Sequence, residues 1–430
     1  MKHRPLYFEY LLLSGLFFTI PSTFSQTSAD PELLAAIQKI KAIDNHSHVL
    51  PARKPEPAES ERPDPLGRTP FGYPVRLRVT NPEYIDAWRA LYGYKHHDMA
   101  AEHVREALKA KLRLMVEKGT DYPSWILDQA GIDIILVNMP SLGPGQNAPR
   151  FLWVPKADGF LFPFGGEKKE VKWVRKEVGL DSVPASLQEY ENNIRQQLEQ
   201  WRQAGAVAIK FTIAYFRPLD FAPASEDEAN HVFEGHRTDG KPSAQEYRIL
   251  QDFLFHFMAQ EAGRLRLAVH IHTGIGADPY FNISGSNPLL LETMFNDPAL
   301  WQTNFVMVHG GWPFEREAGV MLIKPNVYAD FSDQAFLRST EALSEVLRAW
   351  LEWYPEKILF GTDAYPEDTP LANWEEKLWL ATRTARQALA IALTQMLQAG
   401  QITRPRAEEL ARMVLRENAF RLYGLALNER

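Results

Sequence analysis

Two histidines one residue apart follow a short apolar run near the start of the chain, at His46 and His48. Alternate side chains of a strand share a face, so we expect both imidazoles on one side, about 7 Å apart along the strand. Neutral imidazole is a common metal ligand, and two such rings can bind one ion. The pair could equally be polar residues on a solvated strand face, and the rest of the chain must decide between these interpretations.

The composition restricts the kind of site that such a pair can belong to. The 430-residue chain has no cysteine, which excludes disulfides and thiolate ligands. A metal would then be bound by His, Asp, Glu or a modified Lys, which favours zinc, with manganese or iron as alternatives. The net charge of −7 disfavours a nucleic-acid partner and favours a small-molecule substrate.

Later apolar runs also end in residues that can bind metals or transfer protons. These residues are Lys210, His270, His272, His309 and Asp363. If the runs are parallel strands of one barrel, their carboxyl ends meet at one face, where catalytic residues of such barrels gather. Five histidines and one aspartate would then converge on a single site.

Strands and helices alternate along the chain in the way that this interpretation requires. Apolar strand patterns occupy 43–50, 132–138, 159–164, 206–212, 265–273, 305–309, 327–331 and 358–363, and helical patterns occupy 30–41, 184–204, 243–263, 287–300, 314–324 and 339–354. Eight short apolar strands separated by helices indicate an α/β fold, a (β/α)8 TIM barrel. A doubly wound open sheet is the alternative.

The alternation of side chains predicts which strand residues face the barrel axis. Lys210, His270 and His272 fall on inward positions. In the sixth strand we expect Val306 and Val308 to face the helices and His309 to point inward. His270 lies deeper than His272 and is expected to support the site rather than bind a metal. His309 could also be a hydrogen-bonded core histidine, and Lys210 could be a buried ion-pair partner of Asp363.

Three segments extend the barrel. Residues 51–118 form a long insertion after the first strand, first proline-rich and then helical, and we expect a lid. Two helical segments after Pro366 form a terminal cap. Residues 1–25 combine a basic start, an apolar core and small residues, which predicts a signal peptide cleaved near Ser25–Gln26, with residues 26–430 as the exported periplasmic or secreted domain. An uncleaved N-terminal anchor is the alternative.

Short motifs resemble the amidohydrolase superfamily, in particular its amidohydrolase-related branch. The motifs are His46-Ser47-His48, His272-Thr273-Gly274, Val308-His309-Gly310-Gly311, Gly361-Thr362-Asp363-Ala364 and the terminal Glu417-Asn418-Ala419-Phe420-Arg421-Leu422-Tyr423. The resemblance covers roughly residues 38 to 425. It implies a metal-dependent (β/α)8 barrel that acts as a hydrolase or as a decarboxylase of aromatic or enoic acids.

The resemblance also implies roles for these residues. His46, His48, His272 and Asp363 would bind one divalent ion, with Asp363 as general acid and base and His309 polarising the substrate. Lys210 stands about where two-metal members carry a carboxylated lysine, so a second ion is implied only if Lys210 is carboxylated.

The substrate and the reaction remain open at this point. Strand ends and the loops beyond them offer four candidate substrate contacts: Asn138, Arg217, Trp312 and Tyr365. The arginine would suit an anionic substrate. Hydrolysis of an amide, lactone or ester is the first hypothesis, non-oxidative decarboxylation is the second, and a non-catalytic barrel that binds a metal or ligand is the third. A homo-oligomer is compatible with the sequence.

Overall fold

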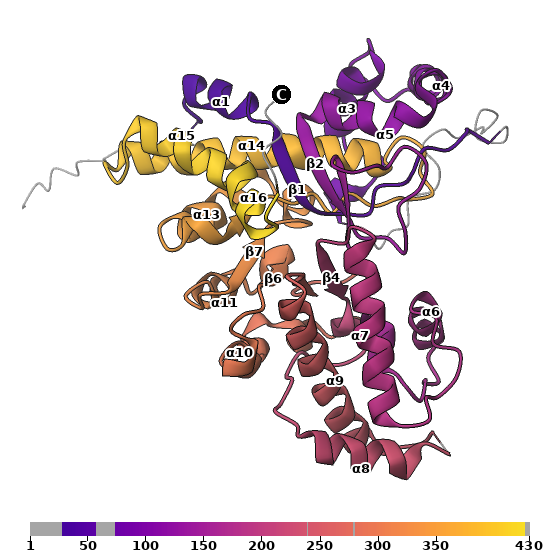
Figure 1. Ribbon diagram of the computed structural model, residues 1–430. Coiled ribbons are helices and arrows are strands. Elements are labelled where there is room, and N and C mark those ends of the chain that lie inside the picture. Colours follow the sequence, from indigo (N-terminus) through magenta and orange to yellow (C-terminus); the bar gives the residue numbers. More distant parts are fainter. Residues whose placement is uncertain (1–27, 57–73, 239, 278–279, 426–430) are drawn as a thin grey trace, which may run out of the picture.

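A computed structural model describes residues 28–56, 74–238, 240–277 and 280–425 (Figure 1). The expected signal peptide and its cleavage site lie outside this part of the chain, as does most of the proline-rich stretch at the start of the insertion. Among the described residues, no helix combines the length and the apolar character needed to cross a membrane.

Eight parallel strands form the centre of the molecule. They are β1 (Ala42–Ser47), β2 (Ile132–Val137), β3 (Phe151–Trp153), β4 (Ala208–Phe211), β5 (Ala268–His272), β6 (Phe305–Val308), β7 (Val327–Asp330) and β8 (Ile358–Leu359). They form two ladders in sequence order, β1 to β3 and β4 to β8. The strand expected at 159–164 is wrong, because Asp158–Leu161 is a buried 3-10 turn and β3 lies earlier. A short apolar run does not distinguish these two structures.

Main-chain hydrogen bonds join the two ladders on both sides. Between β3 and β4, the amides of Val207 and Lys210 donate to the carbonyls of Trp153 and Pro155, at 3.1 and 2.8 Å. Between β8 and β1, three bonds of 2.7–2.8 Å run from Asn45 to Phe360, from His48 to Ala364 and from Asp363 to His46. The chain therefore forms the expected (β/α)8 barrel.

The barrel interior corrects one expectation. Val306 and Val308 pack inside the barrel with residues of the other strands, whereas Phe305 and Met307 belong to the outer core against the helices. His309 would therefore face outward if β6 continued. Instead β6 ends at Val308, and His309 has a φ of 70°, which turns the chain at that point.

Helices surround the barrel and extend it at both ends (Figure 1). They are α1 (Pro31–Gln38), α3 (Glu83–Tyr92), α4 (Ala101–Lys118), α5 (Tyr122–Ala130), α6 (Lys169–Glu177), α7 (Leu187–Gln203), α8 (Glu226–His236), α9 (Ala244–Arg264), α10 (Glu292–Phe295), α11 (Glu315–Met321), α12 (Gln334–Leu337), α13 (Thr340–Leu351), α14 (Trp374–Gln398), α15 (Arg404–Arg412) and α16 (Asn418–Leu422). The helix expected at 287–300 is broken into short turns, where Asn287 and Asp297 each precede a proline and cap a new turn.

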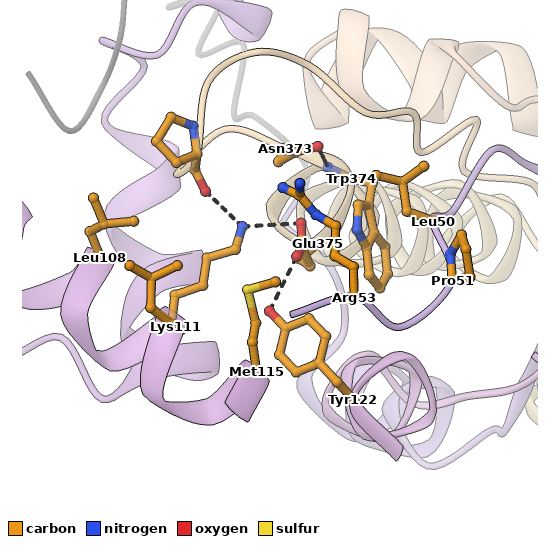
Figure 2. Close-up of a pocket in the computed structure, with 12 residues that line it drawn as sticks. Leu50, Pro51, Arg53, Leu108, Lys111, Met115, Tyr122, Asn373, Trp374 and Glu375 are labelled. Carbon is orange, nitrogen blue, oxygen red and sulfur yellow. Dashed lines mark hydrogen bonds and ion pairs between the residues drawn. The ribbon is translucent and has the colours of Figure 1, made fainter. Parts of the chain in front are cut away.

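The insertion after β1 is helical and is attached to α14 by buried polar contacts (Figure 2). The Lys111 ammonium on α4 donates to the Pro370 carbonyl at 2.7 Å and pairs with Glu375 and Glu376 at 3.0 Å. Tyr92 on α3 donates to Glu376 at 2.6 Å. These contacts hold α3 and α4 on the first turn of α14, which follows the β8 loop. The expectation that the insertion covers the site as a lid stays a prediction.

The end of the chain closes the other end of the barrel. Phe420 and Leu422 of α16, with Tyr423 after it, pack against the interior cluster that contains Val306 and Val308. The terminal motif is thus a plug for the barrel interior, and Tyr423 is placed among the strand residues.

Candidate metal centre

Three of the expected metal ligands meet at one point at the carboxyl ends of β1 and β8. The Nε2 atoms of His46 and His48 lie 3.3 and 3.4 Å from Oδ1 of Asp363. One ligand atom from each residue lies within 4.8 Å of the other two. His46 is buried and Asp363 is 14% exposed, so the group opens only narrowly toward the barrel mouth.

The hydrogen bonds of His48 test whether this group suits a cation. Its Nδ1 lies 2.8 Å from the Asn138 carbonyl, which can only accept, so Nδ1 carries a proton. In the neutral ring, Nε2 then presents a lone pair to the Asp363 carboxylate. Two acceptors at 3.4 Å repel each other unless a cation or a proton lies between them. The donor set, two imidazoles and a carboxylate, fits a divalent ion such as zinc.

His272 lies beside this group but is not one of the three. Its ring centroid is 4.7 Å from that of His309, and its Nε2 is buried with no hydrogen-bond partner among the described residues. Burial, with the nearby Lys210 ammonium, lowers the pKa of His272 to about 3, so the ring is neutral. An unpartnered neutral nitrogen here is available as a further ligand.

Lys210 lies inside the barrel under the same group. Its Nζ is 3.4 Å from Nε2 of His46, and the residue is 1% exposed. Burial lowers the pKa of Lys210 to about 8, although Asp363 and Asp330 favour the ammonium. The structure therefore places Lys210 at the inward position that we expected, next to the proposed metal ligand His46.

His309 is held by the end of β7. Asp330 accepts the His309 amide at 2.9 Å and the Ser332 hydroxyl at 2.5 Å, and that hydroxyl lies 3.0 Å from Nδ1 of His309. Since the hydroxyl proton is given to Asp330, Ser332 accepts the Nδ1 proton of His309. The neutral ring then has its lone pair on Nε2. Burial, despite the nearby Asp363, holds the pKa of His309 well below its usual value.

Asp363 reaches this site through an unusual backbone conformation. Its φ is 53°, and the preceding Thr362 donates its amide and hydroxyl to Asp44, at 2.9 and 2.5 Å. Burial alone would raise the pKa of Asp363, but the imidazole rings around it, those of His309, His46 and His48, hold it well below its ordinary value. The buried side chain of Asp44, inside β1, thus fixes the loop that carries the proposed acid and base.

Asp333 is a site residue that the sequence reasoning missed. Together with His309 and Asp363 it forms a second group whose ligand atoms lie within 4.8 Å of one another. Its φ is 64°, and burial together with Asp363 raises its pKa well above the ordinary value. It lies three residues after β7, beyond the apolar run, so strand parity carried no signal for it.

The predicted contact Arg217 is paired with an acidic residue of the chain. Its guanidinium lies 2.7 Å from Asp252 on α9, and both side chains are only 7% exposed. It also lies 4.5 Å from the Phe221 ring. The chain itself therefore supplies an anionic partner for Arg217, and its role as a substrate contact stays a prediction.

The other three predicted contacts have different positions. Asn138 is fully buried; its carbonyl accepts from His48 and its side-chain amide donates to Val154, at 2.8 Å each, so it positions His48. Trp312 and Tyr365 are half-buried in the loops after β6 and β8. The Lys377 ammonium lies 3.4 Å from the centroid of the Tyr365 ring. These two aromatic residues remain candidate substrate contacts.

An aromatic wall beside His272 was also missed. The Tyr215 ring is 4.9 Å from His272 and 4.8 Å from Phe281, which itself lies 5.7 Å from His272. Tyr215 follows β4 in a 3-10 turn, and its hydroxyl accepts from the Ala277 amide at 3.0 Å. The sequence offered only the position of Tyr215 shortly after a strand, which many residues share.

A comparison with known protein families identifies the family to which this barrel belongs. A family model described as Amidohydrolase matches residues 178–425, more than half of the chain. The chain belongs to the amidohydrolase family. The match covers the strands that carry Lys210, His272, His309 and Asp363 and ends on the α16 plug.

A curated relative of this amidohydrolase-family chain is Protein fluG of Emericella nidulans. It is 29% identical over 231 residues, which are 51% of this chain and 26% of that protein. The chain therefore spans about a quarter of the length of the curated relative that it matches, and activity is not carried over from the whole protein.

Solved structures share the fold across nearly the whole chain. A protein described provisionally as a metal-dependent hydrolase, from Lactobacillus casei, covers 92% of this chain and 98% of its own, with a TM-score of 0.64 at 18% identity. A uronate isomerase from Thermotoga maritima covers 91% and 96%, with a TM-score of 0.63 at 13% identity. A glucuronate isomerase from Caulobacter crescentus covers 93% and 94%, with a TM-score of 0.63 at 13% identity. At these identities the likeness concerns the fold alone.

Proposed function

We propose that the protein is a metal-dependent hydrolase of small molecules, cleaving an amide, lactone or ester bond. His46, His48 and Asp363 would hold one divalent ion, most suitably zinc, with His272 as the further ligand. Such an ion supplies a nucleophile by lowering the pKa of water from 15.7 toward about 7, and it polarises a carbonyl. The observation that carries the proposal is the convergence of bare imidazole nitrogens and a carboxylate oxygen within 3.4 Å.

The chain's own residues then move the protons. The ionised Asp363 accepts a proton from the attacking water and delivers it to the leaving group, which is general base and general acid work by one carboxylate. His309, with its Nδ1 proton held by Ser332, offers Nε2 to water or, once protonated, to the developing oxyanion. The narrow exposure of Asp363 keeps this exchange away from bulk solvent.

The test of the proposal is the origin of the oxygen in the product. Zinc-loaded and manganese-loaded protein is incubated with panels of lactones, amides, esters and aromatic or enoic acids in water enriched in heavy oxygen, and products are read by mass spectrometry. We expect one heavy oxygen in each new carboxylate. Turnover with release of carbon dioxide and no heavy-oxygen incorporation would overturn the hydrolase proposal in favour of decarboxylation.

One observation favours decarboxylation of an aromatic or enoic acid as the second candidate. Tyr215 and Phe281 place aromatic surface directly beside His272. A planar substrate can stack on such surface, and aromatic pairs contribute about 0.5–1.5 kcal/mol beyond area burial. A carboxylate on that substrate would then lie among the same His and Asp residues, with Asp363 protonating the adjacent carbon.

The remaining parts of the proposal concern stoichiometry and location. We propose one ion per chain, with Lys210 uncarboxylated beside His46; a carboxylated Lys210 would supply oxygen ligands for a second ion. We further propose export to the periplasm or medium through residues 1–25. Cell fractionation of the full-length chain, with N-terminal sequencing of the mature form near Gln26, tests the location, and an uncleaved membrane-bound product would contradict it.

A further inference from the structure

A continuous chain of hydrogen bonds crosses the barrel interior from the terminal plug to His309. Nε2 of His270 lies 2.7 Å from the Tyr423 hydroxyl, which donates to Oδ1 of Asn45. The Asn45 amide donates to Oδ2 of Asp330 at 2.7 Å. Asp330 in turn accepts from the amide and hydroxyl groups that hold His309. None of the residues in this hydrogen-bond chain is a proposed metal ligand.

The donors and acceptors along this chain can be assigned in one direction. Tyr423 has one hydroxyl proton, and it goes to Asn45, so Tyr423 must accept a proton from Nε2 of His270. The other ring nitrogen of His270, Nδ1, is buried and has no hydrogen-bond partner among the described residues. Because Oδ1 of Asn45 is occupied by Tyr423, the amide nitrogen is forced toward Asp330.

The last links determine the state of His309. Every group around Asp330 is then a donor: the Asn45 amide, the main-chain amides of His309 and Ser332, and the Ser332 hydroxyl. The Ser332 hydroxyl can therefore accept only from Nδ1 of His309, which leaves the lone pair of the neutral ring on Nε2. Reversal of the Asn45 amide would place its oxygen against the Asp330 carboxylate, and the sequence of donors and acceptors along the hydrogen-bond chain would be lost.

We propose that Tyr423 is a positioning residue that fixes the tautomer and orientation of His309 through Asn45, Asp330 and Ser332. It acts from the opposite end of the barrel, on a segment that packs as a plug. The inference deepens the proposed function, since it concerns a residue of the same site, but the hydrogen-bond chain itself does not depend on which reaction the site performs.

The test is a histidine NMR measurement on full-length protein labelled with ¹⁵N-histidine, comparing wild type with Tyr423→Phe. The wild type should show a slowly exchanging Nδ1 proton of His309, assigned by its loss in His309→Asn. In Tyr423→Phe we expect this resonance to shift by more than 1 ppm or to broaden beyond detection. We also expect kcat to fall about tenfold with KM within twofold.

The matched control removes another buried tyrosine hydroxyl. Tyr190 is 1% exposed, and its hydroxyl donates to the Phe160 carbonyl at 2.7 Å; neither residue belongs to the hydrogen-bond chain described above. Tyr190→Phe should lower the melting temperature about as much as Tyr423→Phe and leave the His309 resonance unchanged. An unchanged resonance in Tyr423→Phe, or an equal change in both variants, would overturn the proposal.

Two further outcomes remain distinguishable. If Tyr423→Phe does not fold, Asn45→Ser breaks the same chain one link further on, and an unchanged His309 resonance in that variant would count against the proposal. If the wild type shows neither bound metal nor hydrolysis but the resonance still shifts in Tyr423→Phe, the positioning role stands while the proposed function fails.

Discussion

Nε2 of His48 lies 3.4 Å from Oδ1 of Asp363, although His48 follows the first strand of the barrel and Asp363 follows the eighth. Three main-chain hydrogen bonds between these strand ends bring the two residues together. The site therefore exists because the barrel closes, and any change that opens the β8 to β1 junction should remove it. The same junction carries Thr362 and Asp44, which fix the strained backbone at Asp363.

Replacement of the proposed acid and base should stop turnover. In Asp363→Asn the amide cannot accept a proton, so kcat should fall by roughly 10²- to 10⁴-fold. Steady-state kinetics with metal content measured in parallel separate a loss of proton transfer from a loss of the ion. Asp181→Asn, at an exposed position, is the control. Full activity in Asp363→Asn would contradict the assigned role.

The lowered pKa of Lys210 predicts that the stability of the metal-free protein depends on pH. Its pKa is about 8 when folded and near 10.5 when unfolded, so between these values the unfolded state binds more protons. The free energy of unfolding should therefore rise with pH in this window, by on the order of 3 kcal/mol in total. Chemical denaturation of metal-free wild type and Lys210→Met checks this. An identical rise in the variant would assign the effect to other groups.

Lys210→Met also tests the number of ions. If Lys210 is a free amine, the variant should keep one divalent ion per chain under metal-replete conditions. A fall from two ions to one or none, with bicarbonate-dependent loading of the wild type, would show instead that Lys210 is carboxylated and bridges two ions. Elemental analysis of both proteins decides between these outcomes.

Arg217 should matter for folding and not for substrate affinity. Arg217→Met leaves Asp252 buried without its partner, which typically costs about 3–5 kcal/mol. We expect a lower melting temperature and a KM within twofold of wild type. The double variant with Asp252→Leu should recover most of the stability. A tenfold or larger rise in KM in the stable double variant would restore Arg217 as a substrate contact.

The attachment of the insertion to α14 depends on Lys111. Lys111→Met removes the cation from Glu375 and Glu376, and two buried carboxylates then face each other, which should cost roughly 3 kcal/mol. Limited proteolysis should cut near α3 and α4 sooner than in the wild type. Lys109→Met, exposed on the same helix, is the control. Equal proteolysis rates would show that other contacts hold the insertion.

The residues at the strand ends were predictable from the sequence. An apolar run indicates a strand, and a His or Asp at its end indicates a residue of the site. The expected inward direction of His309 rested on Val306 and Val308 facing the helices; in the structure they face the axis, and a positive φ at His309 turns its ring to the site. Backbone turns of this kind leave no periodic signal. The ion pair of Arg217 could not be predicted for a different reason, because its partner Asp252 is 35 residues away and a local pattern cannot reveal a tertiary ion pair.

Asp333, Tyr215 and Tyr423 were out of reach for related reasons. Asp333 and Tyr215 lie in loops beyond the strand ends, where neither alternation nor helical spacing applies. Tyr423 lies in a terminal motif that was noted as a family likeness, but only the packing of α16 into the barrel shows that its hydroxyl reaches Asn45. Residues that act through tertiary hydrogen bonds are visible only once the chain is folded.

The metal content of the purified protein tests the central claim most directly. Elemental analysis of wild type, His46→Ala and the exposed control His231→Ala is carried out after identical purification and dialysis. We predict about one divalent ion per chain, most suitably zinc, in the wild type and in His231→Ala, and less than a tenth of that in His46→Ala. An equal metal content in all three proteins, or none in the wild type after loading, would contradict the assignment of His46, His48 and Asp363 as a metal centre.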